Sequence, residues 1–185
     1  MSYPKKITRE TILQAALSCI ERDGVSALSM RTLAADLGVT PNALYRYFAN
    51  KAALEYAMAD EAGRILLGEL ERGIEGLPPL QALQAMGVAY LRFARQYPAL
   101  YMVKMSFCKD ADQEPESHTR IWALVQGLMA SVSTIRQPDD LALSMWAYLH
   151  GVVELDRMDL LEGRPMEDIL AAGFSLFMAG LAPSR

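Results

Sequence analysis

The chain has 185 residues, of which 52% are apolar and 22% are charged, and its 18 cationic and 22 acidic side chains leave a net charge of −4. This composition excludes a disordered chain, two cysteines exclude a disulfide scaffold, and the length fits one compact domain or a small module fused to a larger one. The chain does not open with the basic and then apolar segment of a secretory leader. The uncharged stretch at 169–182 has only 14 residues, whereas a helix that crosses a bilayer needs roughly 20. We therefore expect a cytoplasmic protein.

The first quarter of the chain predicts a series of helices with clear start and stop signals. A first helix keeps its apolar residues on one face and ends at Gly24. Ser29 is a suitable N-cap for a short second helix, and Gly38 supplies the left-handed conformation that closes it. Thr40 and Pro41 then start a third helix at once. Besides the helix between Ser29 and Gly38, we expect helices at about residues 8–22, at 41–47, and from 50 to 73 or 76.

The rest of the chain also predicts helices, because strand signals are lacking and good helix formers are abundant. The Pro78-Pro79 pair marks the clearest boundary between parts of the chain. Downstream of it we expect helices at about 79–96, 98–107, 116–135, 139–161 and 165–181, with a polar loop at 109–117. The sequence therefore predicts an all-α protein.

Residues 29–48 describe two short helices joined by a turn that contains glycine, which is the helix-turn-helix arrangement. Ala34 is small where the helices cross, and the shared core is expected to contain Leu33, Leu37, Leu44 and Phe48. The second helix presents outward Thr40, Pro41, Asn42, Tyr45 and Arg46. A helix of this width fits the major groove of DNA. An ordinary hairpin of two helices has the same spacing, so spacing alone leaves both interpretations open.

The charge is unevenly distributed along the chain. Residues 1–51 carry seven cationic and four acidic side chains, a net of +3, whereas residues 52–185 carry a net of −7. Because electrostatic screening in cells acts over about 8 Å, a distant acidic region does not cancel a basic one. The N-terminal part can therefore bind an anionic partner. Lys5, Lys6 and Arg9 form a basic arm that either touches the DNA backbone or is a disordered tail.

The run from Leu33 to Phe48, followed by Asn50-Lys51 and Leu54, resembles the N-terminal domain of TetR-type transcriptional regulators. The combination Leu-Tyr-x-x-Phe and then Asn-Lys-x-x-Leu is specific, and the resemblance covers about residues 8–58. It implies a three-helix DNA-binding domain at 1–51 that extends into the long fourth helix at 50–75. This helix joins it to a C-terminal bundle of about five helices at 52–185, for ligand binding and dimerisation. It further implies a repressor that binds a palindromic operator in double-stranded DNA as a homodimer and responds to a small molecule.

The resemblance assigns DNA contacts to nine residues: Arg31, Thr40, Pro41, Asn42, Ala43, Tyr45, Arg46, Tyr47 and Lys51. Tyr45 and Lys51 match phosphate-binding positions, and Asn42 lies in the first turn of the recognition helix, where the base sequence is read. Tyr47 stands where the family often has histidine, and its hydroxyl can still donate to phosphate. The alternatives are half-buried packing for Tyr45 and plain solvation for Arg46.

Aromatic and methionine side chains recur at helical spacing in the C-terminal two-thirds of the chain. Such a stripe is more often core than ligand pocket, but TetR-type proteins generally hold a small-molecule cavity in this region. The pocket candidates, for an apolar or aromatic effector, are Tyr90, Phe93, Tyr101, Met105, Trp122, Trp146, His150 and Glu154. The Trp146…His150-Gly151 arrangement is similar to a recurring C-terminal variant of the family. His150 and Glu154 either orient a polar group of the effector or are an ordinary exposed pair or core histidine.

The last predicted helix carries an apolar stripe that predicts a dimer interface. Its members are Leu170, Gly173, Phe174, Phe177, Met178 and Leu181, and Gly173 and Gly180 would allow close approach of a second copy. A dimer would supply the two recognition helices that two half-sites need, about 34–36 Å apart or a multiple of that.

Nothing in the sequence points to an enzyme. His118 and His150 are the only histidines, and neither Cys19 nor Cys108 has a sequence partner that would suggest a nucleophile or a metal site. Phosphate-binding glycine loops and zinc-ligand spacings are also lacking. We therefore expect no catalytic residue, no metal and no cofactor. The alternative function is a helical small-molecule-binding module whose N-terminal hairpin is only structural.

Overall fold

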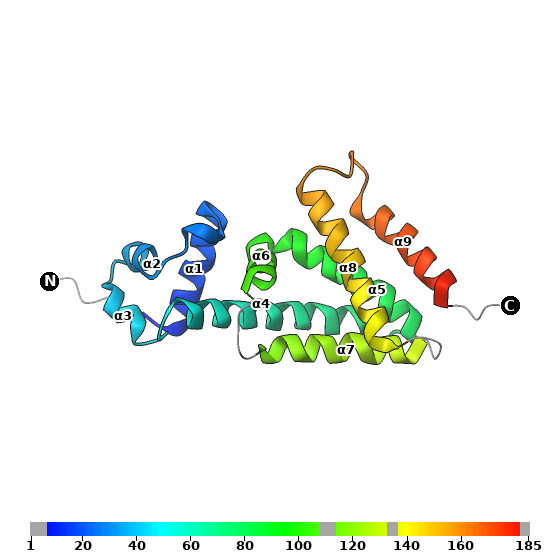
Figure 1. The fold of residues 1–185 in the computed structure, drawn as a ribbon, viewed down its shortest axis with the longest axis horizontal. Helices are drawn as coiled ribbons and strands as arrows, with labels where there is room; N and C mark the ends of the chain where they lie inside the picture. The colour runs from blue at the N-terminus through cyan, green and yellow to red at the C-terminus, as the bar shows by residue number, and fades with distance from the viewer. Residues whose placement is uncertain (1–6, 108–113, 133–136, 182–185) are drawn as a thin grey trace. The chain divides into compact units, whose positions relative to one another are not determined.

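The computed structural model describes residues 7–107, 114–132 and 137–181, and every regular element in these ranges is helical (Figure 1). The elements are α1 (Arg9–Asp23), a 3-10 turn η1 (Val25–Ala27), α2 (Met30–Leu37), α3 (Pro41–Tyr45), α4 (Lys51–Ile74), α5 (Pro79–Gln96), α6 (Pro98–Phe107), α7 (Glu116–Val132), α8 (Pro138–Arg157) and α9 (Met166–Leu181). The all-α prediction is confirmed. Of the candidates above, Lys5, Lys6 and Cys108 lie outside the described residues, as does the side chain of Leu181. None of the described helices is long and apolar enough to cross a membrane.

The chain forms two compact units that do not follow its linear order. The first unit contains residues 1–64 and 97–117, and the second contains residues 65–96 and 118–185. The first unit takes in α6 because α6 packs against α1. The first half of α4 also belongs to the first unit, and the expected DNA-binding domain at 1–51 was likewise predicted to extend into the helix at 50–75.

Local hydrogen bonds explain where the helices of the first unit begin and end. α1 and α2 each start with a capping box, in which Thr8 pairs with Thr11 and Ser29 pairs with Thr32. α2 ends at Gly38, whose φ of 68° lies in the left-handed region that glycine favours. The third helix is shorter than the expected 41–47: it ends at Tyr45, and the next residues form a tight turn in which the amides of Tyr47 and Phe48 both donate to the Leu44 carbonyl.

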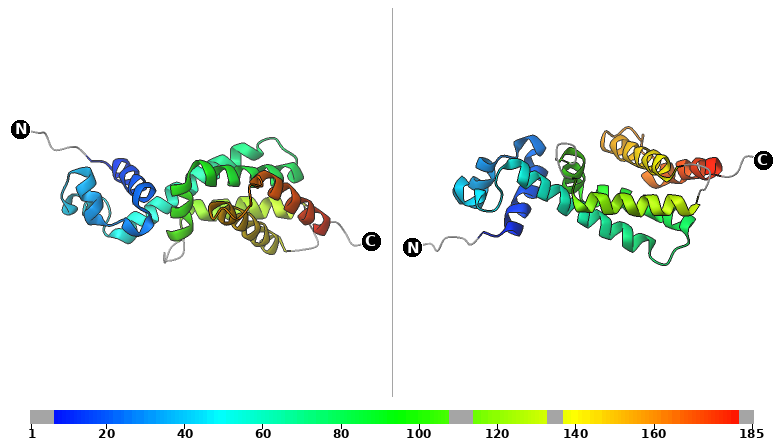
Figure 2. Two further views of the ribbon diagram at one scale, coloured as in Figure 1. Left: turned by 90° about the horizontal axis from the view of Figure 1, so that it is seen from above. Right: turned by 60° about the horizontal axis from the view of Figure 1, so that its bottom comes forward.

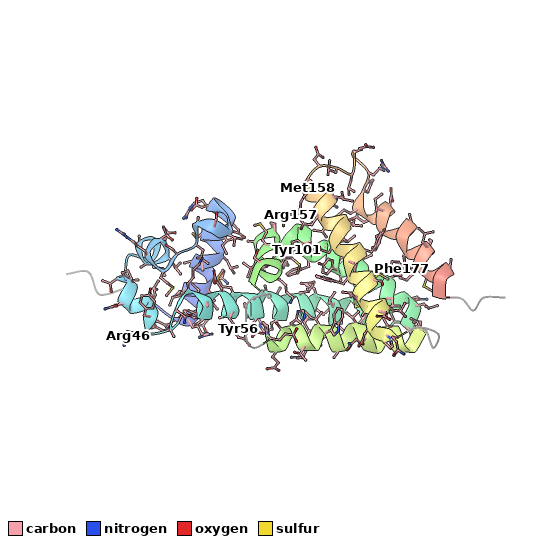
Figure 3. The ribbon with its side chains drawn as sticks, in the orientation of Figure 1. Arg46, Tyr56, Tyr101, Arg157, Met158 and Phe177 are labelled. Atoms are coloured by element: carbon pink, nitrogen blue, oxygen red, sulfur yellow. The ribbon has the colours of Figure 1, made fainter. Side chains whose placement is uncertain are left out.

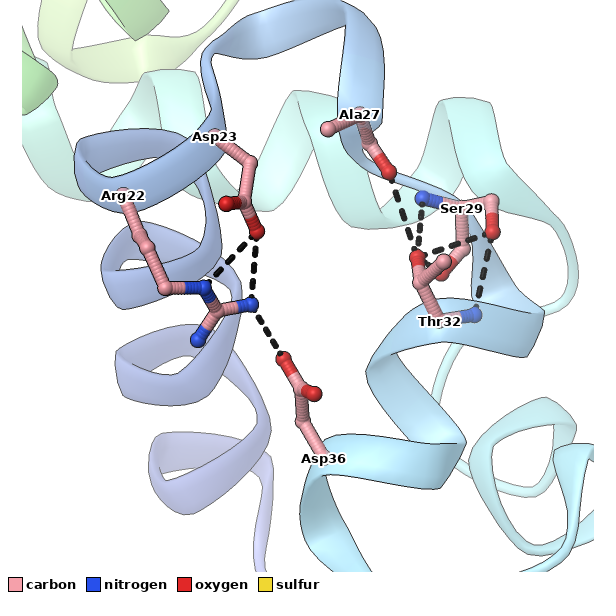
Figure 4. Close-up of polar contacts among 6 residues, drawn as sticks. All are labelled: Arg22, Asp23, Ala27, Ser29, Thr32 and Asp36. Carbon is pink, nitrogen blue, oxygen red and sulfur yellow. Dashed lines mark hydrogen bonds and ion pairs between the residues drawn. The ribbon is translucent and has the colours of Figure 1, made fainter.

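The core of the first unit is made by side chains from α1 to α4 that are each at most 2% exposed. They include Ile12, Ile20, Leu28, Leu33, Ala34, Leu44, Phe48 and Leu54, whereas Leu37, expected in this core, is only half-buried. Outside the core, the Arg22 guanidinium lies 2.7 Å from the Asp23 carboxylate and 2.9 Å from the Asp36 carboxylate (Figure 4). This ion pair connects the end of α1 to α2, so these two helices are joined by charge as well as by packing. We call α1, α2, α3 and the start of α4 the head of the protein.

In the second unit, α8 and α9 pack against each other, as both views in Figure 2 show. Gly173 on α9 lies directly under the ring of Tyr148 on α8: a Cβ added at Gly173 would be 2.1 Å from the Tyr148 Cζ and hydroxyl oxygen. The Tyr148 hydroxyl donates to the Ile169 carbonyl, and the Tyr148 ring lies 5.9 Å from that of Phe177. Desolvation raises the pKa of the Tyr148 phenol further above neutral pH, where a phenol is already protonated and able to donate.

The connection between α8 and α9 differs from the expectation. The helix expected at 139–161 ends at Arg157, because Asp159 takes a left-handed conformation with a φ of 57° and the Leu160 amide donates back to the Leu155 carbonyl at 2.9 Å. This 6→1 hydrogen bond is the usual end of a helix that closes on a left-handed residue, a role in which aspartate is tolerated better than most side chains. Arg95 of α5 then bridges to Asp156 and Glu167 on either side of this connection.

Candidate DNA interface

The nine residues assigned to DNA contacts all lie in the first unit, on α2, on α3 and the turn after it, and at the start of α4. All are exposed except Ala43, which is half-buried. Tyr45 has 47% of its surface exposed, so its side chain is accessible to a ligand although about half of it packs against the protein. The structure therefore brings these residues together on the accessible surface of one unit.

The first turn of α3 is free to meet a ligand. Thr40 precedes the helix but its side chain makes no capping hydrogen bond, and Pro41 at the first helical position has no N–H. Within the described residues, the Asn42 side chain also forms no hydrogen bond. Side chains that are exposed and have no internal partner can bind base edges without first losing a contact within the protein.

The cationic side chains of the head differ in whether an ion pair within the protein already occupies them. Within the described part of the chain, Arg31 and Arg46 form no ion pair, and Figure 3 shows Arg46 pointing outward beyond α3. Lys51, at the start of α4, instead lies 3.1 Å from the carboxylate of Glu55 one turn along the same helix. A phosphate must therefore compete with Glu55 for the Lys51 ammonium.

Tyr47 has a partner that sequence reasoning missed. Its hydroxyl donates to the backbone carbonyl of Ile7 at 2.6 Å, across 40 residues of sequence. A phenol has a single proton, so while this bond stands Tyr47 cannot donate to a phosphate. The guanidinium of Arg9 lies 4.5 Å above the ring of Phe48, the next residue after Tyr47. No local sequence pattern signals either contact.

Three of the helices that carry the expected DNA contacts or lead into them lack acidic residues in their first turns, whereas α1 has Glu10 there. The first turns of α2, α3 and α4 contain no Asp or Glu, and α2 uses Thr32 rather than a glutamate to complete its capping box. In the second unit, α8 and α9 each have two acidic residues in the first turn: Asp139, Asp140, Glu167 and Asp168. The positive ends of α2 and α4 are thus left without a negative side chain of their own helix.

The pocket candidates are divided between the two units. Tyr101 and Met105 belong to the first unit and the other six to the second. In the second unit, Tyr90 and Phe93 are buried, Trp122, His150 and Glu154 are half-buried, and Trp146 is 39% exposed. Trp146 and His150 stack, with ring centroids 5.5 Å apart. They share an accessible face of α8 with Leu143, which is also exposed.

The stripe expected to form a dimer interface is partly used inside the second unit. Leu170 is 2% exposed and packs against Gly87 of α5, and Gly173 lies under Tyr148. Phe174, Phe177 and Met178 are half-buried. Beyond the first turn, which contains Glu167 and Asp168, the exposed side of α9 carries no charge and consists mainly of small residues: Ala171, Ala172, Ser175, Leu176, Ala179 and Gly180. Leu176, which sequence reasoning did not single out, is 77% exposed.

Comparison with known proteins matches both parts of the chain. Residues 12–58 match the family model for bacterial regulatory proteins of the tetR family, and residues 83–181 match the model for the tetracyclin repressor-like C-terminal domain. The chain is 26% identical to Rv0681, an uncharacterized HTH-type transcriptional regulator of Mycobacterium tuberculosis, over 88% of this chain and 76% of that protein. It is 33% identical to the HTH-type transcriptional repressor DrrR1 of Streptomyces coeruleorubidus, over 54% of this chain and 36% of that protein.

A solved structure has the same fold over almost the whole chain. A protein of unknown function from Rhodococcus sp. RHA1 is similar with a TM-score of 0.81 and 26% identity, covering 98% of this chain and 100% of that one. The C-terminal family model alone spans more than half of the chain, and the N-terminal model covers the helix-turn-helix. On this evidence, the chain belongs to the TetR family of bacterial transcriptional regulators.

Proposed function

We propose that this protein is a repressor that binds a palindromic operator as a homodimer in the cytoplasm and is released by a small apolar or aromatic molecule. The observation that carries the DNA-binding part is the surface formed by α2, α3 and the start of α4, where the side chains expected to contact DNA are exposed. Phosphate contacts from Tyr45, Arg31 and Lys51 would position the head, and Thr40 and Asn42 would read base edges.

A second copy is needed because one chain presents one recognition helix, whereas a palindrome has two half-sites. We place the dimer interface on α8 and on the exposed side of α9 beyond its acidic first turn. Leu143 and Trp146 are exposed on α8 and Leu176 on α9. Large apolar side chains gathered on neighbouring helices mark an interaction surface, and small residues around Leu176 allow the backbones of two helices to approach closely.

Variants of Lys51 and Glu55 test the proposed phosphate contacts, because they should change DNA affinity in opposite directions. Lys51→Ala should weaken DNA binding and lower the slope of log affinity against log salt by about 0.9 for each half-site, because one counterion fewer is released. Glu55→Gln should strengthen binding, because it removes the carboxylate that competes for the Lys51 ammonium. Fluorescence anisotropy with duplex DNA between about 50 and 200 mM salt measures both quantities.

Tyr45→Phe is the control for these charge changes. It removes a neutral hydroxyl, so affinity should fall while the salt slope stays unchanged, and the fall should be similar on all duplex sequences. Asn42 variants should instead change which base is preferred, by about 1–3 kcal/mol. If Lys51→Ala left both affinity and slope as in the wild type, the alternative of a structural hairpin in a small-molecule-binding module would gain support.

Release by an effector requires that the effector binds the DNA-incompetent arrangement better than the competent one, and about a hundredfold preference is needed for a hundredfold loss of operator affinity. We expect an apolar or aromatic compound to quench tryptophan fluorescence and to release DNA over the same concentration range. The variant Trp122→Phe leaves Trp146 as the single tryptophan, so it shows whether the quenched fluorescence comes from Trp146.

His150→Ala separates a polar anchor from a structural residue. Weaker effector binding with unchanged DNA affinity supports an anchoring role for His150, whereas equal effector binding assigns it to the packing of Trp146, on which it stacks. If no compound from an apolar and aromatic panel binds, the effector part of the proposal is wrong and the DNA-binding part is unaffected.

A further inference from the structure

Two contacts join the beginning of α1 to the residues that follow α3. The Tyr47 hydroxyl donates to the Ile7 carbonyl at 2.6 Å, and the Arg9 guanidinium carbon lies 4.5 Å from the centroid of the Phe48 ring. Figure 1 shows the start of α1, in dark blue, beside the connection between α3 and α4. We call these four residues, Ile7, Arg9, Tyr47 and Phe48, the α1–α3 clasp.

The clasp restrains Arg9 without neutralising it. Phe48 is 2% exposed, so its ring has a fixed orientation in the core, while Arg9 itself is exposed. A guanidinium stacked on an aromatic face uses its flat surface for that contact and keeps the N–H groups around its edge available. In the described part of the chain Arg9 forms no ion pair. It is therefore an exposed positive charge that is held in place by an aromatic ring and not by a carboxylate.

The Tyr47–Ile7 bond fixes the backbone on the N-terminal side of Arg9. Ile7 directly precedes Thr8, which caps α1, so the position of its carbonyl sets where the first turn of α1 begins. Phe48 and Tyr47 are adjacent, so one short segment after α3 holds both the backbone before α1 and the side chain of its first residue. Since Lys51 starts α4 three residues after Phe48, the same segment leads directly into another expected phosphate contact.

We propose that Arg9 is a phosphate-binding residue of the operator complex and that Tyr47 is the residue that positions it, not a phosphate ligand itself. This inference rests on the proposed DNA-binding function. Restraint before binding matters because a flexible arginine loses rotamer freedom when it binds phosphate, and the clasp reduces that loss. A guanidinium can also bind two phosphate oxygens at once, which a lysine cannot.

A double-mutant cycle tests the two roles. Arg9→Gln should weaken binding to duplex DNA about tenfold and lower the salt slope by about 0.9 for each DNA-binding unit in contact with the duplex. Tyr47→Phe alone should weaken binding by a smaller factor, about threefold, because Arg9 remains but is less well held. In the Arg9→Gln background, Tyr47→Phe should have no further effect, since a positioning residue acts only through the group it positions.

The same experiment can overturn the inference. If Tyr47→Phe weakens binding by the same factor with and without Arg9, Tyr47 acts on DNA directly and its positioning role is wrong. If Arg9→Gln leaves the salt slope unchanged, Arg9 does not bind phosphate. The matched control is Arg72→Gln, which removes an exposed arginine at the far end of α4, where Arg72 pairs with Glu69, and should change neither affinity nor slope.

The probe is a duplex of random sequence, because phosphate contacts contribute to non-specific binding as well and no operator needs to be known. Thermal unfolding of each variant verifies that the head remains folded, and the salt slope is a readout that a purely structural role would not move. If the wild-type protein binds no duplex at all, the proposed function fails and this inference with it. If the wild type and Arg72→Gln bind while Arg9→Gln behaves like them, only the inference fails.

Discussion

Gly173→Ala is expected to lower the free energy of unfolding by at least about 2 kcal/mol, the usual range for forcing an extra group into a packed core. The added Cβ would be 2.1 Å from the Tyr148 Cζ and hydroxyl oxygen, far inside van der Waals contact. Movement of the ring is restrained, because its hydroxyl donates to the Ile169 carbonyl and the tilted ring of Phe177 lies 5.9 Å away, centroid to centroid. The clash outweighs the gain of up to about 1 kcal/mol that alanine normally brings to a helix.

Gly127→Ala is the matched control for this change. Gly127 is an exposed residue of α7, and a Cβ added there meets nothing within 4 Å. This variant should therefore be more stable than the wild type by about 0.5–1 kcal/mol. Urea unfolding at one fixed protein concentration, which keeps any dimerisation contribution constant, measures both variants. Gly173→Ala as stable as Gly127→Ala would mean that the Tyr148 ring is free to swing out.

Leu176→Asp is expected to convert the dimer into monomers and to reduce operator affinity by at least about a hundredfold. Burying a leucine contributes about 1.5–3 kcal/mol, and a two-fold interface loses this contribution twice when the residue is changed. The two new carboxylates would also be desolvated near each other across the axis. A monomer retains one recognition helix and binds one half-site, which removes the advantage of simultaneous binding.

Leu176 is a better test position than the phenylalanines of the α9 stripe. Phe174→Asp or Phe177→Asp should also give monomers, but Phe177 touches Tyr148, so its loss disturbs the unit itself. Leu176 is 77% exposed, and its replacement leaves the internal packing intact. Leu80→Asp on α5 is the control, because Leu80 is a 47% exposed leucine outside α8 and α9. Light scattering after size-exclusion chromatography gives the mass; a dimer that survives Leu176→Asp would place the interface elsewhere.

The helices that were predicted best are those whose limits are set by local chemistry. The expected ranges 79–96 and 98–107 agree with α5 and α6 residue for residue, because Pro79 and Pro98 start these helices in a way that few other residues do. The end of α8 was missed by four residues because Asp159 adopts a left-handed conformation that only the surrounding structure reveals. Helix limits set by glycine or proline can be recognised in a sequence, whereas a helix end that depends on one aspartate in a left-handed conformation cannot.

The candidate sites show the same contrast between local and distant information. The DNA-contact residues lie together because one short motif carries nearly all of them. The partner of Tyr47 lies 40 residues away, and no periodicity connects it to Ile7. On α9, spacing identified an apolar stripe but could not tell whether it faces the chain's own α5 and α8 or a second copy. Leu170 and Gly173 face inward, and the exposed side of α9 contains Leu176.

The absence of acidic residues from the first turns of α2 and α4 has a consequence for the stability of the head. α8 and α9 neutralise the positive ends of their helix dipoles with their own carboxylates, an effect of about 0.3–1 kcal/mol for each helix. α2 and α4 are capped by the neutral side chains of Ser29 and Asn50 but have no carboxylate in their first turns, so a bound anion would add a favourable interaction with their positive ends. Operator phosphates near these helix starts would supply the negative charge that the first turns lack, so DNA binding is expected to raise the thermal stability of the DNA-binding unit.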